Sequence, residues 1–462
     1  MYFMISLKSA PCIAALFVCA IPATAQCVAN GPGGSKVNPN RPAETDTPEA
    51  HFSPVSVVND RLPSWICFSG GYRARFEGYS GGGFLPNSSD SYLLTRFRFG
   101  MLLKPAPWLR VYTELQDATA FMKTPPRLPP YQETWDLRRA YLELGDLQEG
   151  HLAVRAGRQD LSIADGQLLG ISYWRNASRG YDGVQLVSNW PGFNATVMAA
   201  SQVVLFENGL SHHAPGNNIY VADAKLSHLA PHTVVEPFAL WRVTPGLKTE
   251  EGAPAKLDEK TVGVHWTGTV GSHWDYTAEI ARQFGHLGGD TVRSWAAMGI
   301  GGFTFHPGRF KTRVFGEYDF ASGDQNPRDG VRGAFDQLFP NLHDHLGLAD
   351  QFGRQNLKAL RTGARLWMRG NWIVAAAWGD YWLANSKDSF YNSAGAIVAR
   401  DTSGLSGTHI AGEVDLQTSY RFDRNLEFGV GFAHVRPGEF LLKTDHPASY
   451  NYPYLMMNYN FF

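Results

Sequence analysis

The last twelve residues, 451–462, constrain the fold of this chain more than any other segment. They read NYPYLMMNYNFF, with apolar side chains at every second position from Leu455 to Phe461, one residue short of the terminal Phe462. Successive side chains of a strand point to opposite faces, so this pattern predicts a strand with one lipid-compatible face. A membrane β-barrel has such a terminal strand, because closure pairs the last strand with the first. We therefore predict an all-β transmembrane barrel.

The first 25 residues have the features of an export signal. Lys8 precedes an apolar run from Ile13 to Ile21, and the small residues 23–25 suit cleavage before Gln26. The run is shorter than the roughly 20 apolar residues of a membrane helix, and no later stretch reaches that length. The predicted segments are a signal peptide at 1–25, a poorly ordered periplasmic lead-in at 26–63, and one barrel at 64–462.

Two cysteines, Cys27 and Cys67, remain after the predicted cleavage. In an oxidising periplasm they could form a disulfide that joins the lead-in to the first strand. Two free thiols are equally consistent with the sequence.

From Ser64 onward polar and apolar residues alternate with the period of a strand. Arg73, Arg75 and Glu77 share one face of their segment, and Tyr72, Ala74 and Phe76 share the other. About eighteen strands of this kind can be placed, in antiparallel up-and-down order, and their connections alternate between short and long. Short connections are expected near Pro105, 189–191, Gly271 and 423–424, and long ones near 118–133, 162–180, 285–291 and 321–355. Short periplasmic turns, long extracellular loops and an even strand number are typical of bacterial outer-membrane barrels.

A barrel of this size encloses a water-filled channel, so its inward-facing charges decide what passes. The formal net charge is −1, which suggests no nucleic-acid partner, and most of the 41 basic residues are Arg, the cation that grips carboxylates in a bidentate manner. Arg alternating with acids would bind an anionic sugar weakly at many sites, as conduction requires. The predicted pore-lining residues are Arg73, Arg75, Glu77, Arg96, Arg98, Arg110, Glu114, Arg139, Glu143, Arg155, Asp182, Arg361, Arg365, Glu413, Asp415 and Arg421. The alternative is that such ion pairs only stabilise the wall of a wide barrel.

Two strings of residues resemble the alginate-export family of outer-membrane proteins. Residues 157–186 contain Gly157-Arg158-Gln159, Trp174-Arg175-Asn176 and Arg179-Gly180-Tyr181-Asp182-Gly183, similar to the family segment GRQ…W-x-N…R-x-[FY]-D-G. Residues 317–350 contain EYDFASGD and FDQLFPNLH, which are also similar. The resemblance implies an eighteen-stranded porin with an Arg-rich pore that passes alginate outward. The tight turn expected at 423–424 departs from family members that carry a long periplasmic plug there.

We therefore expect a non-enzymatic channel in the outer membrane of a Gram-negative-type bacterium. Its expected partners are an anionic polysaccharide or sugar acid as substrate, outer-membrane lipid and periplasmic export components, with no nucleic acid, cofactor, catalytic residue or metal site. A general or small-anion porin is one alternative. A barrel lipid hydrolase is a remote one, with Ser419 and His434 as its nearest candidates. Trp174 and Tyr181 could stack on sugar rings or belong to an aromatic girdle at the lipid interface.

Overall fold

A computed structural model describes residues 54–147, 150–306, 310–326, 328–368 and 371–461 of the chain. The predicted signal peptide and most of the predicted lead-in lie outside these residues. Within them, no helix is long and apolar enough to cross a membrane.

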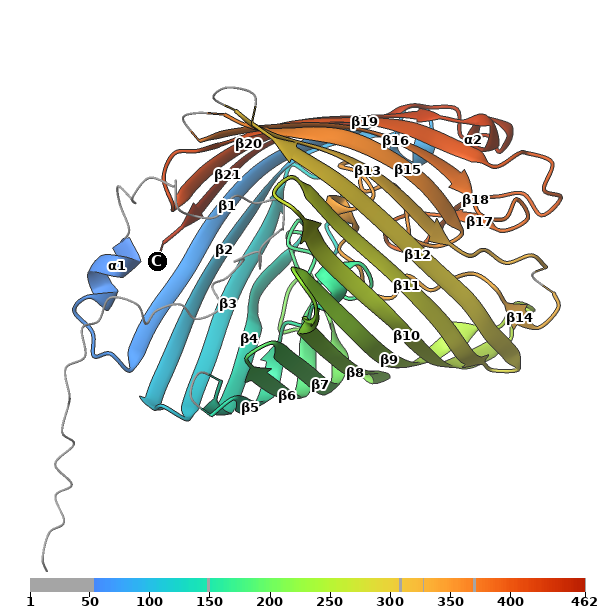
Figure 1. The fold of residues 1–462 in the computed structure, drawn as a ribbon. Helices are drawn as coiled ribbons and strands as arrows, with labels where there is room; N and C mark the ends of the chain where they lie inside the picture. The colour runs from blue at the N-terminus through green and yellow to red at the C-terminus, as the bar shows by residue number, and fades with distance from the viewer. Residues whose placement is uncertain (1–53, 148–149, 307–309, 327, 369–370, 462) are drawn as a thin grey trace, which may run out of the picture.

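The chain forms a closed antiparallel barrel of 18 strands (Figure 1), as the sequence predicts. The barrel strands are β1 (Ile66–Ser80), β2 (Ser89–Ala106), β3 (Leu109–Phe121), β4 (Glu133–Asp146), β5 (Leu152–Gln159), β6 (Tyr181–Trp190), β7 (Phe193–Val204), β8 (His212–Ala230), β9 (Thr233–Lys248), β10 (Pro254–Val270), β11 (Trp274–Leu287), β12 (Asp290–Phe305), β13 (Lys311–Ala321), β15 (Leu357–Trp367), β16 (Trp372–Leu383), β19 (His409–Arg421), β20 (Leu426–Pro437) and β21 (Tyr450–Asn460). The smaller elements are α1 (Pro54–Asn59), α2 (Glu439–Lys443), β14 (Val331–Arg332), β17 (Ser389–Tyr391), β18 (Ile397–Arg400) and the 3₁₀ turns η2 (Gly82–Phe84), η3 (Ala164–Gly166) and η4 (Leu342–Asp344).

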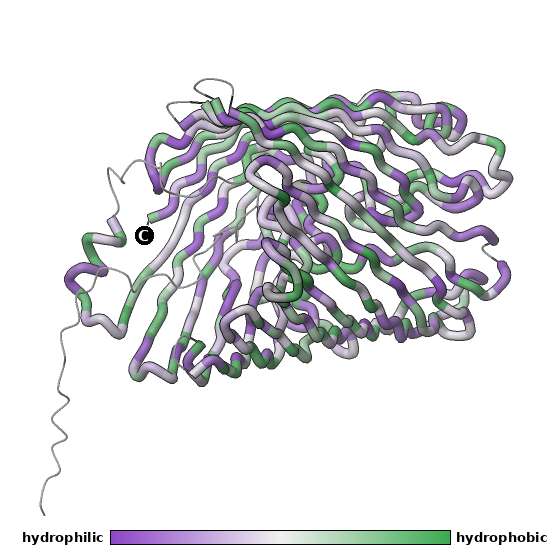
Figure 2. The backbone as a smooth tube through the Cα atoms, viewed as in Figure 1, coloured by the Kyte–Doolittle hydropathy of each residue, from purple (hydrophilic) through white to green (hydrophobic). Residues whose placement is uncertain are grey.

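The terminal strand closes the barrel. β21 pairs antiparallel with β1, with Arg75 opposite Met456, and also with β20. Leu455 is exposed on the outer surface, whereas its neighbours Tyr452 and Tyr454 are buried inside. The alternation of the last residues therefore matches the two faces of a barrel strand, and the same alternation of hydropathy runs along the other strands (Figure 2).

The two ends of the barrel differ in their connections. At one end, called the turn end, neighbouring strands are joined by short turns such as Pro191-Gly192, where the φ of 75° at Gly192 suits a two-residue hairpin. The other end, called the loop end, carries the longest connections, 160–180, 322–356 and 384–408. One expected long loop is wrong. β11 and β12 are joined by Gly288-Gly289 alone, because Gly288 adopts a φ of 61° and allows a tight hairpin where a longer loop was predicted at 285–291.

The described end of the lead-in is attached to the turn end of the barrel. α1 leads into β1, and the Asn59 side chain donates to the Phe68 carbonyl oxygen at 2.8 Å and accepts from the Phe68 N–H at 2.9 Å. Cys67 is disulfide-bonded. Cys27, the partner that the sequence suggests, lies outside the described residues.

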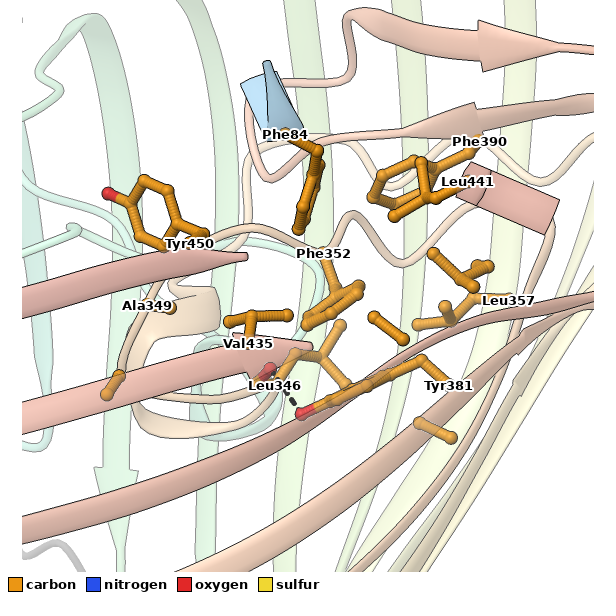
Figure 3. Packing of buried hydrophobic residues seen from close by; sticks show 14 of the residues in the cluster. Phe84, Leu346, Ala349, Phe352, Leu357, Tyr381, Phe390, Val435, Leu441 and Tyr450 are labelled. Atoms are coloured by element: carbon orange, nitrogen blue, oxygen red, sulfur yellow. Dashed lines mark hydrogen bonds between the residues drawn. The ribbon is translucent and has the colours of Figure 1, made fainter. Parts of the chain in front are cut away.

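The apolar core of the molecule lies inside the barrel rather than within a sandwich of sheets. One cluster joins Phe352 of the connection 322–356 to Tyr381 of β16, Val435 of β20 and Leu441 of α2 (Figure 3). The rings of Phe352 and Tyr381 are stacked with centroids 3.6 Å apart. A second cluster packs residues 161–169 and 335–339 against β6 to β9 and β11 to β13. Both clusters show that connections from the loop end fold back into the lumen.

Candidate functional site

Two connections fold into the lumen and determine the space that remains for a solute. The first lumen loop comprises residues 160–180, between β5 and β6, and the second lumen loop comprises residues 322–356, between β13 and β15. Both were predicted as long extracellular loops. Their hydrogen-bonding groups meet charged side chains of the barrel wall that the sequence placed on the lumen face.

The first lumen loop lies against β1 and β2. Arg73 Nη1 donates to the Tyr173 carbonyl oxygen at 2.9 Å, and Arg75 Nη1 donates to that of Trp174 at 2.7 Å. Arg96 Nη1 donates to the carbonyl oxygens of Tyr173 and Arg175, each at 3.1 Å. The guanidinium of Arg75 also covers the Trp174 ring, 3.9 Å from its centroid. These arginines hold loop backbone in place, because each carbonyl oxygen accepts a charged donor.

The same loop also reaches the far wall and the closing strand. Asp165 Oδ2 lies 3.1 Å from His265 Nε2 of β10, and the Ala164 N–H donates to Glu236 Oε1 of β9 at 2.7 Å. The Trp174 indole N–H donates to the Tyr452 hydroxyl of β21 at 3.2 Å. The first lumen loop therefore crosses the lumen from one wall to the opposite one.

The second lumen loop is held by carboxylates and by one buried arginine. Glu413 Oε1 accepts the Ala349 N–H at 2.9 Å, and Asp415 Oδ2 accepts the Leu348 N–H at 3.2 Å. Arg354, whose side chain has 0% exposure, donates to Glu279 Oε1 of β11 at 2.6 Å. The loop is thus attached to β11 and to β19.

The two loops are hydrogen-bonded to each other in mid-lumen. The Phe339 N–H donates to the Leu168 carbonyl oxygen at 2.9 Å, and the Gly170 N–H donates to that of Phe339 at 2.9 Å. The rings of Trp174 and His343 are stacked with centroids 3.9 Å apart. Because each loop is also attached to the wall, they form one structure across the barrel, called here the lumen brace (residues 160–180 and 322–356).

The predicted pore-lining residues all lie on barrel strands, and they fall into two groups. The first group is buried, except for the half-buried Arg96, and serves the lumen brace or its neighbours. Besides the contacts above, Arg98 donates to Ser178 Oγ at 2.7 Å, and Arg361 donates to Glu317 Oε2 at 2.9 Å and to the His345 carbonyl oxygen. The residues of this first group are Arg73, Arg75, Glu77, Arg96, Arg98, Arg361, Glu413 and Asp415.

The second group lies mostly toward the turn end and forms ion pairs along the wall. Glu143 accepts from Arg110 at 2.7 Å and from Arg155 at 2.6 Å, and the two arginine side chains keep 21% and 15% of their surface exposed. Arg139 Nη2 lies 2.5 Å from Glu114 Oε2. Arg365 lies opposite Arg313, and Arg421 lies opposite Glu427. Asp182 does not line the lumen as predicted. It lies at the loop end of β6, on the outward face with the exposed Val184 and Leu186, and binds Arg158 at 2.8 Å.

A cavity of about 710 Å³ opens beside the lumen brace at the loop end, and we call it the outer pocket. Its cationic lining residues are Arg179, Arg242, Lys248, Arg332 and Arg400, and its acidic ones are Glu250, Asp324, Asp336 and Asp388. Arg242 is paired with Asp336, with Nη1 and Oδ2 2.6 Å apart. Arg179 Nη1 donates only to oxygens of the brace, those of Ser172, Phe339 and Pro340. Among the described residues, Arg332 and Arg400 have no carboxylate within ion-pair distance.

The acids of the outer pocket are less charged than their number suggests. Burial and the adjacent Asp324 carboxylate raise the pKa of Glu250 to about 8. Burial also raises the pKa of Asp388. Burial and the nearby Arg175 lower the pKa of Arg179 to about 9, which leaves that guanidinium protonated at neutral pH. The outer pocket therefore carries excess positive charge at pH 7.

Sequence reasoning missed several of these charged residues. Arg158 stands in the quoted string 157–159, three positions after Arg155, so strand period places it on the opposite, outward face, where the structure pairs it with Asp182. Arg332 and Arg354 belong to the second lumen loop, where no periodic pattern indicates a partner. Tyr181 is buried in the interior cluster, and Trp174 lies in the lumen rather than at a lipid interface.

The pair proposed for a lipid hydrolase is not brought together. Ser419 lies opposite Gly429, and His434 lies opposite Val414, five positions away along the strands, which is about 17 Å. The His434 ring instead contacts Asn451 Oδ1 at 2.7 Å. Among the described residues, no three His, Cys, Asp or Glu side chains are grouped to hold a metal ion.

Comparison with known proteins gives a family and a fold. The profile of the family described as "Alginate export" matches residues 64–454. OccK11 (OpdR) of Pseudomonas aeruginosa superposes with a TM-score of 0.56 at 10% identity, covering 86% of this chain and 95% of that chain. OccAB1 of Acinetobacter baumannii gives 0.57 at 8% identity, with 86% and 96% covered, and OpdO of Pseudomonas aeruginosa gives 0.57 at 11%, with 87% and 98% covered. No curated protein sequence matches the chain.

Proposed function

Because this chain belongs to the alginate export family and is an outer-membrane porin channel rather than an enzyme, we propose that it conducts anionic sugar acids and short uronate oligomers. The solute enters or leaves through the outer pocket, passes the lumen brace, and follows the arginines of the wall at the turn end. Alginate, which the family description names, would be a longer solute with the same carboxylated sugar units.

The outer pocket is the observation that carries this proposal. Arg332 and Arg400 offer guanidinium groups without ion-pair partners among the described residues, and Arg179 adds a third that binds only neutral oxygens. A uronate carries one carboxylate on each sugar ring, and Arg binds carboxylates through two parallel N–H bonds. The volume of about 710 Å³ falls in the range of pockets that enclose small organic ligands.

The wall toward the turn end supports passage rather than tight binding. Arg110 and Arg155 are each paired with Glu143, so a passing carboxylate competes with an acid that is already present. Weak binding at successive sites is what conduction requires, since a solute must leave each site as well as enter it. We propose that Arg110, Arg155, Arg365 and Arg421 form this part of the pathway.

The lumen brace favours short solutes over an extended polymer. It crosses the barrel and is hydrogen-bonded to β1, β2, β9 and β19. An intact polymer would have to pass these contacts along its whole length. Short oligomers need to pass them only once.

Reversal potentials across a KCl gradient in planar bilayers test the proposal. We expect the channel to prefer chloride to potassium, and triuronate added on one side to block the current. The double variant Arg332→Gln, Arg400→Gln should weaken the block by about fivefold or more, since one Arg attracts a carboxylate 4 Å away by roughly 1 kcal/mol in water.

Arg293→Gln is the matched control for this double variant. Arg293 is an exposed arginine on the outer face of β12, away from the lumen, so its loss should leave the block unchanged. A parent channel with no anion preference would contradict the proposal. Block by long alginate but not by triuronate would identify the polymer as the cargo.

A further inference from the structure

A second cavity, of about 560 Å³, lies on the outside of the barrel between β16, β19 and α2. We call it the outer-wall groove, and Trp378, Asp380, His409, Arg436, Leu442 and Lys443 are among its lining residues. Gly379, next to Trp378, lies opposite Arg361 and Glu413, which face the lumen, so Trp378 faces outward. α2 buries Phe440 and Leu441 in the interior cluster and leaves Leu442 exposed. The outer-wall groove therefore belongs to the membrane-facing surface, at the loop end (Figure 1).

The outer-wall groove lies where the apolar band of the wall ends. Trp372 begins β16 at the turn end, and Asp380 follows eight positions later (372 to 380), about 26 Å along the strand and, at the usual strand tilt, roughly 20 Å higher in the membrane. The apolar band of an outer-membrane barrel is about 25 Å tall, with aromatic side chains at both edges. Trp372 and Trp378 are both exposed, each by 42%. Asp380, and Arg436 beyond the intervening Gly412, thus lie at headgroup level of the outer leaflet.

Charge pairing within the outer-wall groove leaves one cation available. His409 Nε2 lies 2.6 Å from Asp380 Oδ1, and Lys443 Nζ lies 2.5 Å from Glu439 Oε1. Arg436 is exposed, and it has no hydrogen-bond or ion-pair partner among the described residues. Its guanidinium is therefore free to bind an anion, and a phosphate accepts its N–H groups in a bidentate manner.

We propose that the outer-wall groove binds a phosphorylated glycolipid of the outer leaflet. The phosphate binds Arg436, and the acyl chains lie over Trp378 and Leu442. The combination of an apolar floor, a cation without a partner and a position at the edge of the apolar band matches an amphiphile with an anionic headgroup. A soluble phosphate compound would bind Arg436 but would leave the apolar surface of Trp378 and Leu442 uncovered.

Native mass spectrometry of the purified full-length protein in neutral detergent tests this site. The probes are diphosphoryl lipid A, the same lipid after dephosphorylation, and inorganic phosphate. We expect the parent protein to retain one diphosphoryl lipid A at low lipid concentration, and Arg436→Gln to weaken retention by about fivefold. Arg293→Gln, on the outer wall but far from the groove, should retain the lipid as the parent does.

Four results would overturn the proposal. The first is equal retention by the parent and Arg436→Gln. The second is equal retention of the dephosphorylated lipid, and the third is binding of inorganic phosphate as tight as that of lipid A. A dimer that Arg436→Glu dissociates, with no lipid bound to the parent, would show that a second copy of the chain occupies the outer-wall groove. Heat-dependent gel mobility confirms in each case that the variant barrel is folded.

Discussion

The two halves of the lumen use arginine in different ways. Toward the loop end, Arg73, Arg75 and Arg96 are covered by the first lumen loop and donate to its carbonyl oxygens. Toward the turn end, Arg110 and Arg155 pair with Glu143 and keep part of their surface exposed. Strand period places both sets on the same face of the wall. The difference teaches that an arginine side chain that points into the lumen does not necessarily bind the solute. Its guanidinium can already be hydrogen-bonded to a loop.

The largest contrast between the halves should be in stability. Arg354→Ala removes a fully buried cation and leaves Glu279 and Asp319 without their partner, so the free energy of unfolding should fall by about 3–5 kcal/mol. Arg155→Ala removes a partly exposed pair and should cost about 1 kcal/mol or less. Urea titration of both variants in lipid vesicles measures the difference. Equal losses would mean that the two halves do not differ as described.

A second contrast concerns what each half controls in the current. Trp174→Ala removes the stack on His343, the cover of Arg75 and the hydrogen bond to Tyr452. With the lumen brace loosened, we expect larger and noisier single-channel conductance, and a stability loss of about 1–2 kcal/mol from the lost cation–π contact. Ion selectivity should change little.

The matched variant in the other half is Arg155→Gln. It should lower the preference for chloride without increasing the conductance, because it removes charge and leaves the brace intact. Single-channel recording in a KCl gradient separates these two readouts. If Trp174→Ala shifted ion selectivity as strongly as Arg155→Gln, the proposal that the lumen brace limits the size of the solute, and not its charge, would be wrong.

The smallest expected effect is a pH dependence at the loop end. The pKa of Glu250 is raised to about 8, by burial and by Asp324, so this group is neutral at pH 6.5 and gains a negative charge as pH rises through 8. The outer pocket then becomes less positive, and block by triuronate should weaken between pH 6.5 and pH 8, a range in which Arg179, with its pKa of about 9, stays mostly protonated. Glu250→Gln should remove that change. A pH dependence that persists in Glu250→Gln would assign it to another group.

The wall of the barrel could be predicted from the sequence, whereas the content of the lumen could not. Period-two alternation places Arg73, Glu114 and Glu413 on the inner face because each strand repeats one local rule. The partner of Arg73, however, is the carbonyl oxygen of Tyr173, 100 residues later, and nothing local in 160–180 indicates an inward fold. The resemblance of 157–186 and 317–350 to one family singled out both lumen loops, but it did not reveal that they bind each other.

The contacts of Trp174 also bear on where a solute can leave. β1 and β21 meet at the seam of the barrel, and Trp174 touches both, through Arg75 and Tyr452. The first lumen loop therefore connects the first and last strands of the barrel from inside the lumen. Separating β1 from β21 to release cargo sideways into the lipid would require breaking these contacts of Trp174 as well as the hydrogen bonds between the two strands. We therefore expect transport to follow the barrel axis, from one aqueous compartment to the other.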